Sequence, residues 1–231
     1  MAVLGRLDPT RLVAPRECLG CGSPGTMVCG ACLTNLEAIA GLGCRRCGNP
    51  AIHRDAASCP WCDRLHSIGR PVTTLFAYRD VGRTLFHRIK YEGYWPLIQP
   101  LLRRGAADFF ARVPFTEFTC LTAVPESLTG RRRRHFSPSG MLARDLSRLT
   151  GLPVKPLLAM RLPARHQVGL TLEERRHNAR NRFRIKTDRL PEAVLLVDDV
   201  ITTGATLEAC SRLLEGAGVR RIAWFAMFRT P

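Results

Sequence analysis

The stretch VLLVDDVITTGAT, residues 194–206, places two adjacent aspartates directly after four aliphatic residues. The run from Val194 to Val197 does not alternate between apolar and polar residues, which is typical of a strand buried on both faces of a parallel sheet. The acids therefore stand at the carboxyl end of this strand. A helix is expected next, because apolar or small residues recur at helical spacing: Leu207, Cys210 or Ser211, and Leu214.

The turn between this strand and helix has the chemistry of an anion site. It offers hydroxyl groups, a glycine that lets the backbone approach a ligand, and unpaired amides at a helix start, and these features favour phosphate. Asp198 and Asp199 would repel a phosphate, so we expect them to face sugar hydroxyls or a metal-bearing group. A phosphorylated sugar meets both demands, whereas the alternative is an ordinary turn with incidental threonines. The turn residues are Thr202, Thr203, Gly204, Ala205 and Thr206.

This motif resembles that of the type I phosphoribosyltransferases, which bind phosphoribosyl pyrophosphate (PRPP). The resemblance implies that Asp198 and Asp199 hold the ribose hydroxyls, that Thr202 to Thr206 cradle the 5-phosphate, and that Mg²⁺ accompanies PRPP. Purine salvage transferases commonly carry an aspartate where Thr202 stands, as a candidate base near the purine. The resemblance therefore argues against hypoxanthine or guanine as the acceptor.

Eight of the ten cysteines form four CxxC pairs before residue 63. Two thiolates separated by two residues in a tight turn can face one metal ion, and two such pairs complete a tetrahedral site, so two structural zinc ions are predicted. Disulfides suit a secreted chain, and nothing in the sequence directs export. Consecutive pairing is preferred, and interleaved pairing remains open. The pairs are Cys18 and Cys21, Cys29 and Cys32, Cys44 and Cys47, and Cys59 and Cys62.

The composition changes after Cys62, which divides the chain into a zinc-ribbon domain over residues 1–66 and a second domain over residues 67–231. The cysteine-rich part is too short to bury a sufficient core, so metal is expected to fold it. Strands and helices alternate downstream, which predicts an α/β domain with a mainly parallel sheet. We expect a strand within 67–80, helices from residue 85 and over 95–112, a strand over 119–125, a helix with Leu142, Leu146 and Leu149 on one face, and a closing strand over 220–228.

Cysteine ribbons followed by a phosphoribosyltransferase-like domain resemble the ComF family of competence-associated proteins, which includes the GntX-like proteins. The resemblance implies pyrophosphate contacts in the loop 126–134 and a flexible loop near 165–180 that closes over PRPP. It also implies a role in natural transformation, downstream of DNA entry, beside a competence helicase or another transformation protein. Its marks outside the acid motif are RIKYEG with Lys90, VP at Val124 and Pro125, and QVGLTLEERRHN with Gln167, Arg175 and Asn178. In the loop 126–134, Arg131 and Arg134 are the expected PRPP contacts.

One departure from the family pattern lies in the basic run. The family usually continues this run as RGFNQS, whereas this chain reads RHFSPS at Arg134 to Ser139. His135 replaces the glycine, and Ser137 and Pro138 replace an amide pair that could recognise a partner or substrate. We expect the following helix to keep its packing without that recognition element.

The net charge is +16 and the pI is about 10.5, which favours a polyanionic partner such as single-stranded DNA, or a highly charged phosphate substrate. Only three of the 35 basic residues are lysines, and a GC-rich genome would produce the same skew. The run RRRRHF, residues 131–136, is a candidate phosphate or nucleic-acid patch. No apolar run approaches the roughly 20 residues that span a membrane, so a soluble cytoplasmic protein without membrane insertion is expected.

Two functional hypotheses remain open. In the first, the chain is a phosphoribosyltransferase of unknown acceptor that uses PRPP and Mg²⁺. In the second, it is a non-catalytic competence factor that binds DNA or a partner protein, and its PRPP site is regulatory or vestigial.

Overall fold

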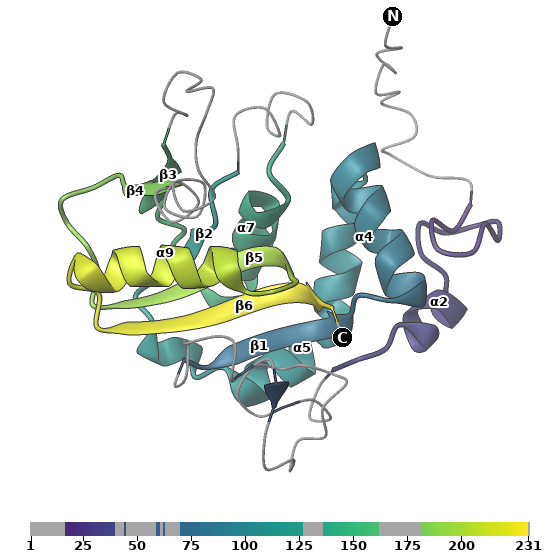
Figure 1. Ribbon diagram of the computed structural model, residues 1–231. Coiled ribbons are helices and arrows are strands. Elements are labelled where there is room, and N and C mark those ends of the chain that lie inside the picture. The colour runs from purple at the N-terminus through teal and green to yellow at the C-terminus, as the bar shows by residue number, and fades with distance from the viewer. Residues whose placement is uncertain are drawn as a thin grey trace, which may run out of the picture.

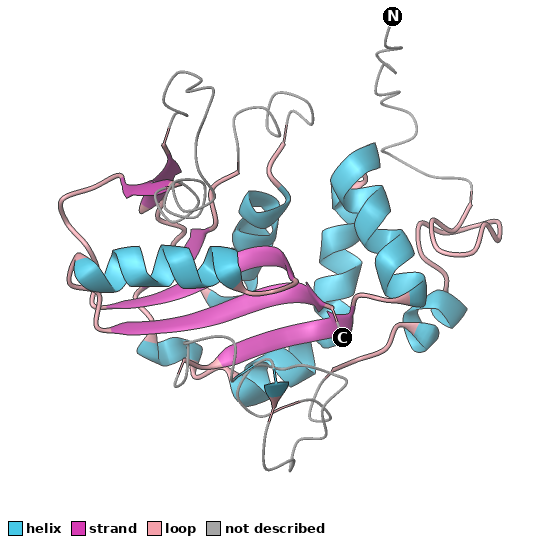
Figure 2. Ribbon diagram, in the orientation of Figure 1, coloured by secondary structure: helices cyan, strands magenta, loops and turns pink. Residues whose placement is uncertain are grey.

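A four-stranded parallel sheet in the order β1-β6-β5-β2 forms the centre of the computed structural model (Figures 1 and 2), which describes residues 17–39, 44, 59, 60, 62, 70–126, 136–161 and 182–230. The prediction of a mainly parallel sheet is confirmed. The strands are β1 (Val72–Ala77), β2 (Cys120–Ala123), β5 (Ala193–Ile201) and β6 (Arg221–Arg229).

Strand β5 is buried on both faces, as its uninterrupted aliphatic run predicts. Leu195 and Val197 join the core cluster on one face of the sheet, and Val194 and Leu196 join the cluster on the other. The strand does not end at the acids but includes them and ends at Ile201. The reason is that parallel pairing with β6 continues to Ile201, which lies opposite Arg229.

Helices cover both faces of this sheet (Figure 1). Helix α9 lies on one face, with α4, α5 and α7 on the other. The predicted stripe of α9 is buried throughout, at Leu207, Cys210, Ser211 and Leu214. In α7, Leu142 and Leu146 are buried as predicted, but Leu149 is 39% exposed because the helix ends one residue later, past the core. The helical elements are α2 (Gly30–Asn35), α4 (Asp80–Glu92), η1 (Trp95–Leu97), α5 (Ile98–Arg112), η2 (Phe115–Glu117), α7 (Pro138–Thr150) and α9 (Ala205–Gly216).

A small two-stranded antiparallel sheet was not predicted. It consists of β3 (Leu158–Met160) and β4 (Phe183–Ile185), and Leu158 and Phe183 pack into the same core cluster as α9. Three-residue strands carry too little periodicity to be found in a sequence. The pair brackets residues 162–181, where the family resemblance puts the closing loop and which lie outside the described residues.

The first cysteine segment is attached to the edge of the main sheet. The backbone N–H of Ile39 donates to the Leu75 carbonyl at 2.9 Å, and that of Ala77 donates to the Glu37 carbonyl at 3.0 Å. Leu19 and Leu36 belong to the same core cluster as α4 and α7. Residues 37–39 thus cover the free edge of β1, while the predicted domain boundary near residue 66 lies outside the described residues.

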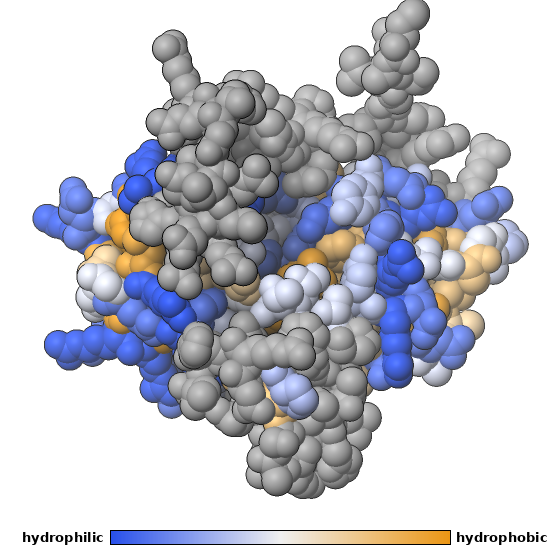
Figure 3. Space-filling model, in the orientation of Figure 1, coloured by the Kyte–Doolittle hydropathy of each residue, from blue (hydrophilic) through white to orange (hydrophobic). Residues whose placement is uncertain are grey.

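Within the part of the chain that the structure describes, no helix has the length and apolar character needed to cross a membrane. The face seen in Figure 3 carries blue hydrophilic residues around smaller orange apolar patches.

Candidate functional site

The carboxyl ends of β2 and β5 lie side by side, because these strands pair in parallel from Cys120 opposite Val194 to Ala123 opposite Val197. The helix that follows β2 is α7, on one face of the sheet, and the helix that follows β5 is α9, on the other. In open α/β sheets, a crevice opens where successive connections diverge in this way, and ligands bind there. The predicted acids and threonine turn stand at this position.

Asp199 forms an ion pair with a lysine from a distant part of the sequence. Lys90, in the last turn of α4, places its Nζ 2.9 Å from Asp199 Oδ2. The same ammonium lies 4.8 Å from the centre of the Phe86 ring. Burial by itself lowers the pKa of Lys90, but Asp199 and then Asp198 outweigh it and raise the pKa above its ordinary value. Lys90 therefore stays charged and supplies the acid pair with its own counter-charge.

In the acid pair of Asp198 and Asp199, the charged form of Asp198 is disfavoured by its surroundings. Burial, followed by the charge of Asp199, raises the pKa of Asp198 well above its usual range. The backbone N–H of Asp199, which donates to Asp198 Oδ1 at 2.9 Å, and the charge of Lys90 oppose this shift without cancelling it. Strongly perturbed carboxyl groups in a crevice are typical of functional sites, since folding alone would favour an uncharged side chain there.

The turn after β5 is built around Gly204, which has φ 74° and ψ −4° and caps the N-terminus of α9. A residue with a side chain is strained in this left-handed conformation. Thr202, Thr203, Ala205 and Thr206 are exposed, and the Ala205 N–H donates to Thr203 Oγ1 at 3.3 Å. Four residues of this helix-start turn are therefore exposed, as an anion site requires.

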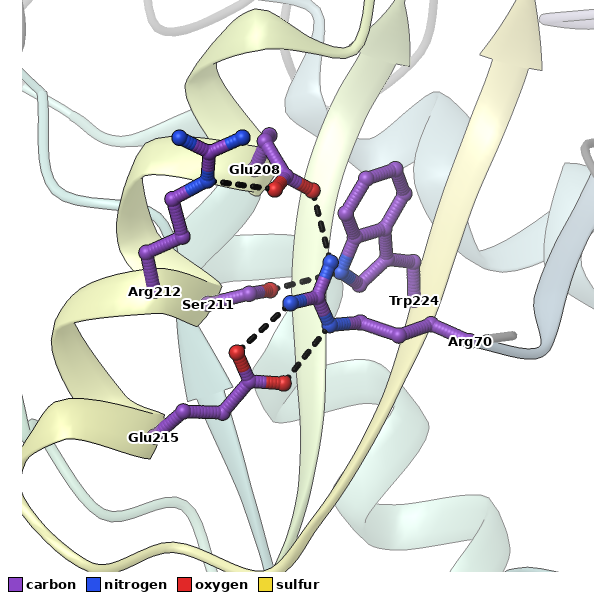
Figure 4. Close-up of polar contacts among 6 residues, drawn as sticks. All are labelled: Arg70, Glu208, Ser211, Arg212, Glu215 and Trp224. Carbon is purple, nitrogen blue, oxygen red and sulfur yellow. Dashed lines mark hydrogen bonds and ion pairs between the residues drawn. The ribbon is translucent and has the colours of Figure 1, made fainter. Parts of the chain in front are cut away.

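Helix α9 is held against the sheet by Arg70 (Figure 4). Its guanidinium binds both carboxylate oxygens of Glu215, with distances of 2.8 and 2.6 Å, and one oxygen of Glu208 at 2.6 Å. It also lies 6.0 Å from the ring centre of Trp224, whose indole N–H donates to Ser211 Oγ at 2.8 Å. These contacts fix the helix whose N-terminus forms the threonine turn.

The altered basic run supports α7. Ser137 accepts a hydrogen bond from the Gly140 N–H at 3.1 Å and so caps the helix, and Pro138 occupies its first turn. The buried Ser139 hydroxyl donates to the Val124 carbonyl at 3.0 Å, which ties the helix start to the end of β2. The helix therefore packs normally, as expected, although the amide pair is replaced.

Several predicted site residues lie outside the described residues, so the structure does not place them. They are Arg131, Arg134, Gln167, Arg175, Asn178 and Cys47. Of the predicted PRPP ligands, the structure brings together Lys90, the two acids and the threonine turn. It adds Arg229, which sequence reasoning took to lie beyond the closing strand and which contacts the turn directly.

The first two CxxC pairs form one cluster, hereafter the first cysteine cluster. The sulfur atoms of Cys18, Cys21, Cys29 and Cys32 all lie within 4.8 Å of one another. Cys21 Sγ and Cys29 Sγ are 3.6 Å apart, far beyond a disulfide bond and close to the ~3.8 Å that tetrahedral bonds of about 2.3 Å to one zinc ion would give. This grouping matches the preferred consecutive pairing.

Local contacts favour the thiolate form of Cys18, whereas burial raises the pKa of Cys32. Burial acts to raise the pKa of Cys18, but backbone N–H donors, foremost that of Cys29, bring it down to about 6. A Cβ on Gly20 would lie 2.7 Å from the Cys32 sulfur, so only glycine allows the turn to pass this closely. Thiolate-favouring donors and a glycine-lined cradle fit a structural zinc ion, which four thiolates would hold to fold the ribbon.

Three cysteines of the other two pairs form a second cluster, in agreement with consecutive pairing. Cys44, Cys59 and Cys62 are buried and their sulfurs lie within 4.8 Å of one another, with Cys44 and Cys62 3.6 Å apart. Cys47, the predicted fourth ligand, is outside the described residues. Three described thiols at zinc-like separation fit a second structural zinc ion.

Comparison with known proteins agrees with this architecture. Residues 10–65 match the family model described as "Double zinc ribbon domain". The competence protein ComFC of Streptococcus pneumoniae is 26% identical over 87% of this chain and 87% of its own length. The DNA utilization protein YhgH of Salmonella typhimurium is 25% identical over 95% of this chain and 99% of its own length. These similarities, which extend over most of the chain, agree with the resemblance to the ComF/GntX family.

The chain thus combines a double zinc ribbon with an α/β domain built on a parallel sheet, as predicted. Among solved structures, the purine phosphoribosyltransferase of Pyrococcus horikoshii is similar, with a TM-score of 0.36 and 17% identity over 58% of this chain and 83% of that chain.

Proposed function

We propose that the crevice at the end of β5 binds PRPP with Mg²⁺, in a protein that serves natural competence or the use of DNA. The observation that carries the proposal is the pairing of Asp199 with Lys90 beside a glycine-capped helix start. Similarity to a competence protein and to a DNA utilization protein supports the cellular role.

Each part of the crevice suits one part of PRPP. Carboxylates accept hydrogen bonds from ribose hydroxyls, and the hydroxyls and amides of residues 202–206 suit the 5-phosphate. Lys90 would offset the negative charge of the acids as the anionic ligand enters. Arg131, Arg134, Gln167, Arg175 and Asn178 are proposed contacts to the rest of the ligand, on the family resemblance.

If the site is catalytic, the acceptor forms a bond to the anomeric carbon as the bond from that carbon to pyrophosphate breaks. Positive charge develops on the sugar ring while pyrophosphate leaves with the bonding electrons. The protein would contribute by positioning the reactants and by placing carboxylates near the developing positive charge.

Calorimetry with PRPP and Mg²⁺ tests the binding site. Asp199→Ala removes charge-assisted hydrogen bonds of about 1.5 to 3 kcal/mol each, so affinity should fall by roughly ten-fold or more. Gly204→Val should do worse, because the turn needs φ 74° and the side chain would occupy the ligand's space. Asp188→Ala, an exposed acid outside the crevice, is the matched control and should bind like the wild type.

The outcomes separate the two hypotheses. Wild-type protein that binds no PRPP would leave the motif as inherited architecture and favour a DNA- or partner-binding role. A screen for pyrophosphate release against candidate acceptors follows if PRPP binds. Binding without release for any acceptor would favour a regulatory site over a transferase.

A second proposed activity is binding of single-stranded DNA through its phosphates, which the net charge of +16 favours. Such binding should show weak sequence preference and fall steeply between roughly 50 and 200 mM salt. An affinity that barely changes over that range would count against it.

A further inference from the structure

Arg229 is a fully buried cation at the end of β6, and the proposed function gives it no role so far. Its residue exposure is 0%, although its sequence position, at the end of an apolar run, suggests a solvent-facing strand terminus. Its backbone is fixed from both sides, since it lies opposite Ile201 of β5 and its carbonyl accepts from the Tyr78 N–H at 2.7 Å. Burying a charged side chain costs folding free energy unless the charge interacts with neighbouring polar groups.

The guanidinium of Arg229 contacts the point where the chain leaves β5 for the threonine turn. Nη1 donates to the Ile201 carbonyl at 3.2 Å and also donates to the Thr202 carbonyl. The next residue reinforces these contacts, because the Thr230 N–H donates to the Ile201 carbonyl at 3.0 Å and its hydroxyl lies 3.3 Å from the same oxygen. Two consecutive carbonyls of the turn are therefore directed toward the end of β6.

The direction of these carbonyls fixes the direction of the amides that follow them. In a planar trans peptide, the C=O and the next N–H point in opposite directions. Since the carbonyls of Ile201 and Thr202 face Arg229, the N–H groups of Thr202 and Thr203 face away from it. Thr202 and Thr203 are both exposed, and the turn leads directly into α9.

We propose that Arg229 is a positioning residue for phosphate binding, which turns the amides of Thr202 and Thr203 toward the 5-phosphate and places a buried positive charge behind them. The inference rests on the proposed PRPP site and identifies a residue that orients its phosphate-binding amides. The ligand class that depends on Arg229 is a sugar 5-phosphate, because only that part of PRPP meets the turn. Pyrophosphate, which is proposed to bind through other residues, should not depend on it.

The experiment compares two ligands by calorimetry on the full zinc-loaded chain, ribose 5-phosphate and pyrophosphate with Mg²⁺. Arg229→Gln should weaken ribose 5-phosphate binding by about ten-fold or more, as expected when charged hydrogen bonds to the turn are lost, and change pyrophosphate binding less than two-fold. Arg229→Lys keeps the charge and should fall between these two proteins. Arg221→Gln, which removes a half-exposed arginine from the other end of β6, is the matched control and should leave both affinities unchanged.

A loss of ribose 5-phosphate binding with pyrophosphate binding intact supports the positioning role, since general loosening of the fold would weaken both ligands. If Arg229→Gln does not fold, the same comparison is made with Arg229→Lys, whose loss of affinity for ribose 5-phosphate should exceed its loss for pyrophosphate. Equal effects on the two ligands, or ribose 5-phosphate affinity within two-fold of wild type, would overturn the inference alone. Wild-type protein that binds neither PRPP nor ribose 5-phosphate would overturn the proposed function and this inference with it.

Discussion

The first cysteine cluster and the acid pair of β5 are both places where groups of like charge crowd together, but they are neutralised differently. In the cluster, four sulfurs lie within 4.8 Å of one another, a spacing that suits tetrahedral ligation, so a zinc ion is expected to supply the counter-charge. At the acid pair, Lys90 provides the counter-charge from within the protein. The cysteine cluster is therefore expected to need its ion in order to fold, whereas the acid pair can stay folded without a ligand.

The largest expected effect follows from breaking the cluster. Cys32→Ser removes a buried ligand, and structural zinc sites contribute roughly 10 kcal/mol or more to folding, so zinc content should fall from two ions per chain to one and the ribbon should unfold. Elemental analysis and circular dichroism measure both changes. Cys210→Ala, at a buried cysteine outside the clusters, should keep both ions. Wild-type protein with fewer than one zinc per chain would contradict the two-ion prediction.

Removing the internal counter-charge should cost less. Lys90→Met leaves Asp199 without its cation in a crevice where its side chain is 14% exposed, and the free energy of unfolding should fall by about 2 to 3 kcal/mol. Urea denaturation measures this change, with Lys155→Met at an exposed position as the control. The double variant Lys90→Met, Asp199→Asn should recover part of the loss. A double variant no more stable than Lys90→Met would show that the ion pair is not the cause.

A change beside the sulfurs, rather than of a sulfur, should have a smaller effect. In Gly20→Ala the new Cβ would lie 2.7 Å from the Cys32 sulfur, and overpacking of this kind typically costs about 1 to 3 kcal/mol. Zinc should bind but be lost to a competing chelator at lower concentration than in wild type. Gly30→Ala is the control, since a Cβ there meets no atom within 4 Å. Equal chelator resistance in the two variants would refute the steric argument.

The smallest expected effect has the opposite sign. Because the pKa of Asp198 is raised in the folded protein, its contribution to stability is present at low pH and is lost as pH rises through the raised pKa. Asp198→Asn removes this loss, and one unit of pKa shift corresponds to about 1.4 kcal/mol, so the melting temperature should rise by a few degrees. Melts between pH 5 and 8 should show the gain growing with pH, and Asp188→Asn should show none. A less stable Asp198→Asn protein at pH 8 would contradict the assignment.

Local patterns predicted most of the architecture, because each is enforced by chemistry within a few residues. The unbroken run from Val194 to Val197 requires two buried faces, and the apolar spacing of α9 requires a helix with one buried stripe. The CxxC pairs predicted metal clusters, since two thiols at that spacing already share a turn. The prediction failed for Leu149 and for the β3 and β4 pair, where the outcome depends on where the core ends rather than on periodicity.

The sequence by itself determined that this chain carries zinc-ligand pairs, a buried parallel strand, an acid pair and a glycine turn with threonines. Only the tertiary structure decided which distant groups meet them. Lys90 reaches Asp199 because α4 packs into the same core cluster as β5, and Arg229 reaches the turn because β6 pairs with β5 to its last residue. The residues next to a charged side chain in the sequence do not show which group it will contact. Its burial and its counter-charge depend on how the whole fold packs.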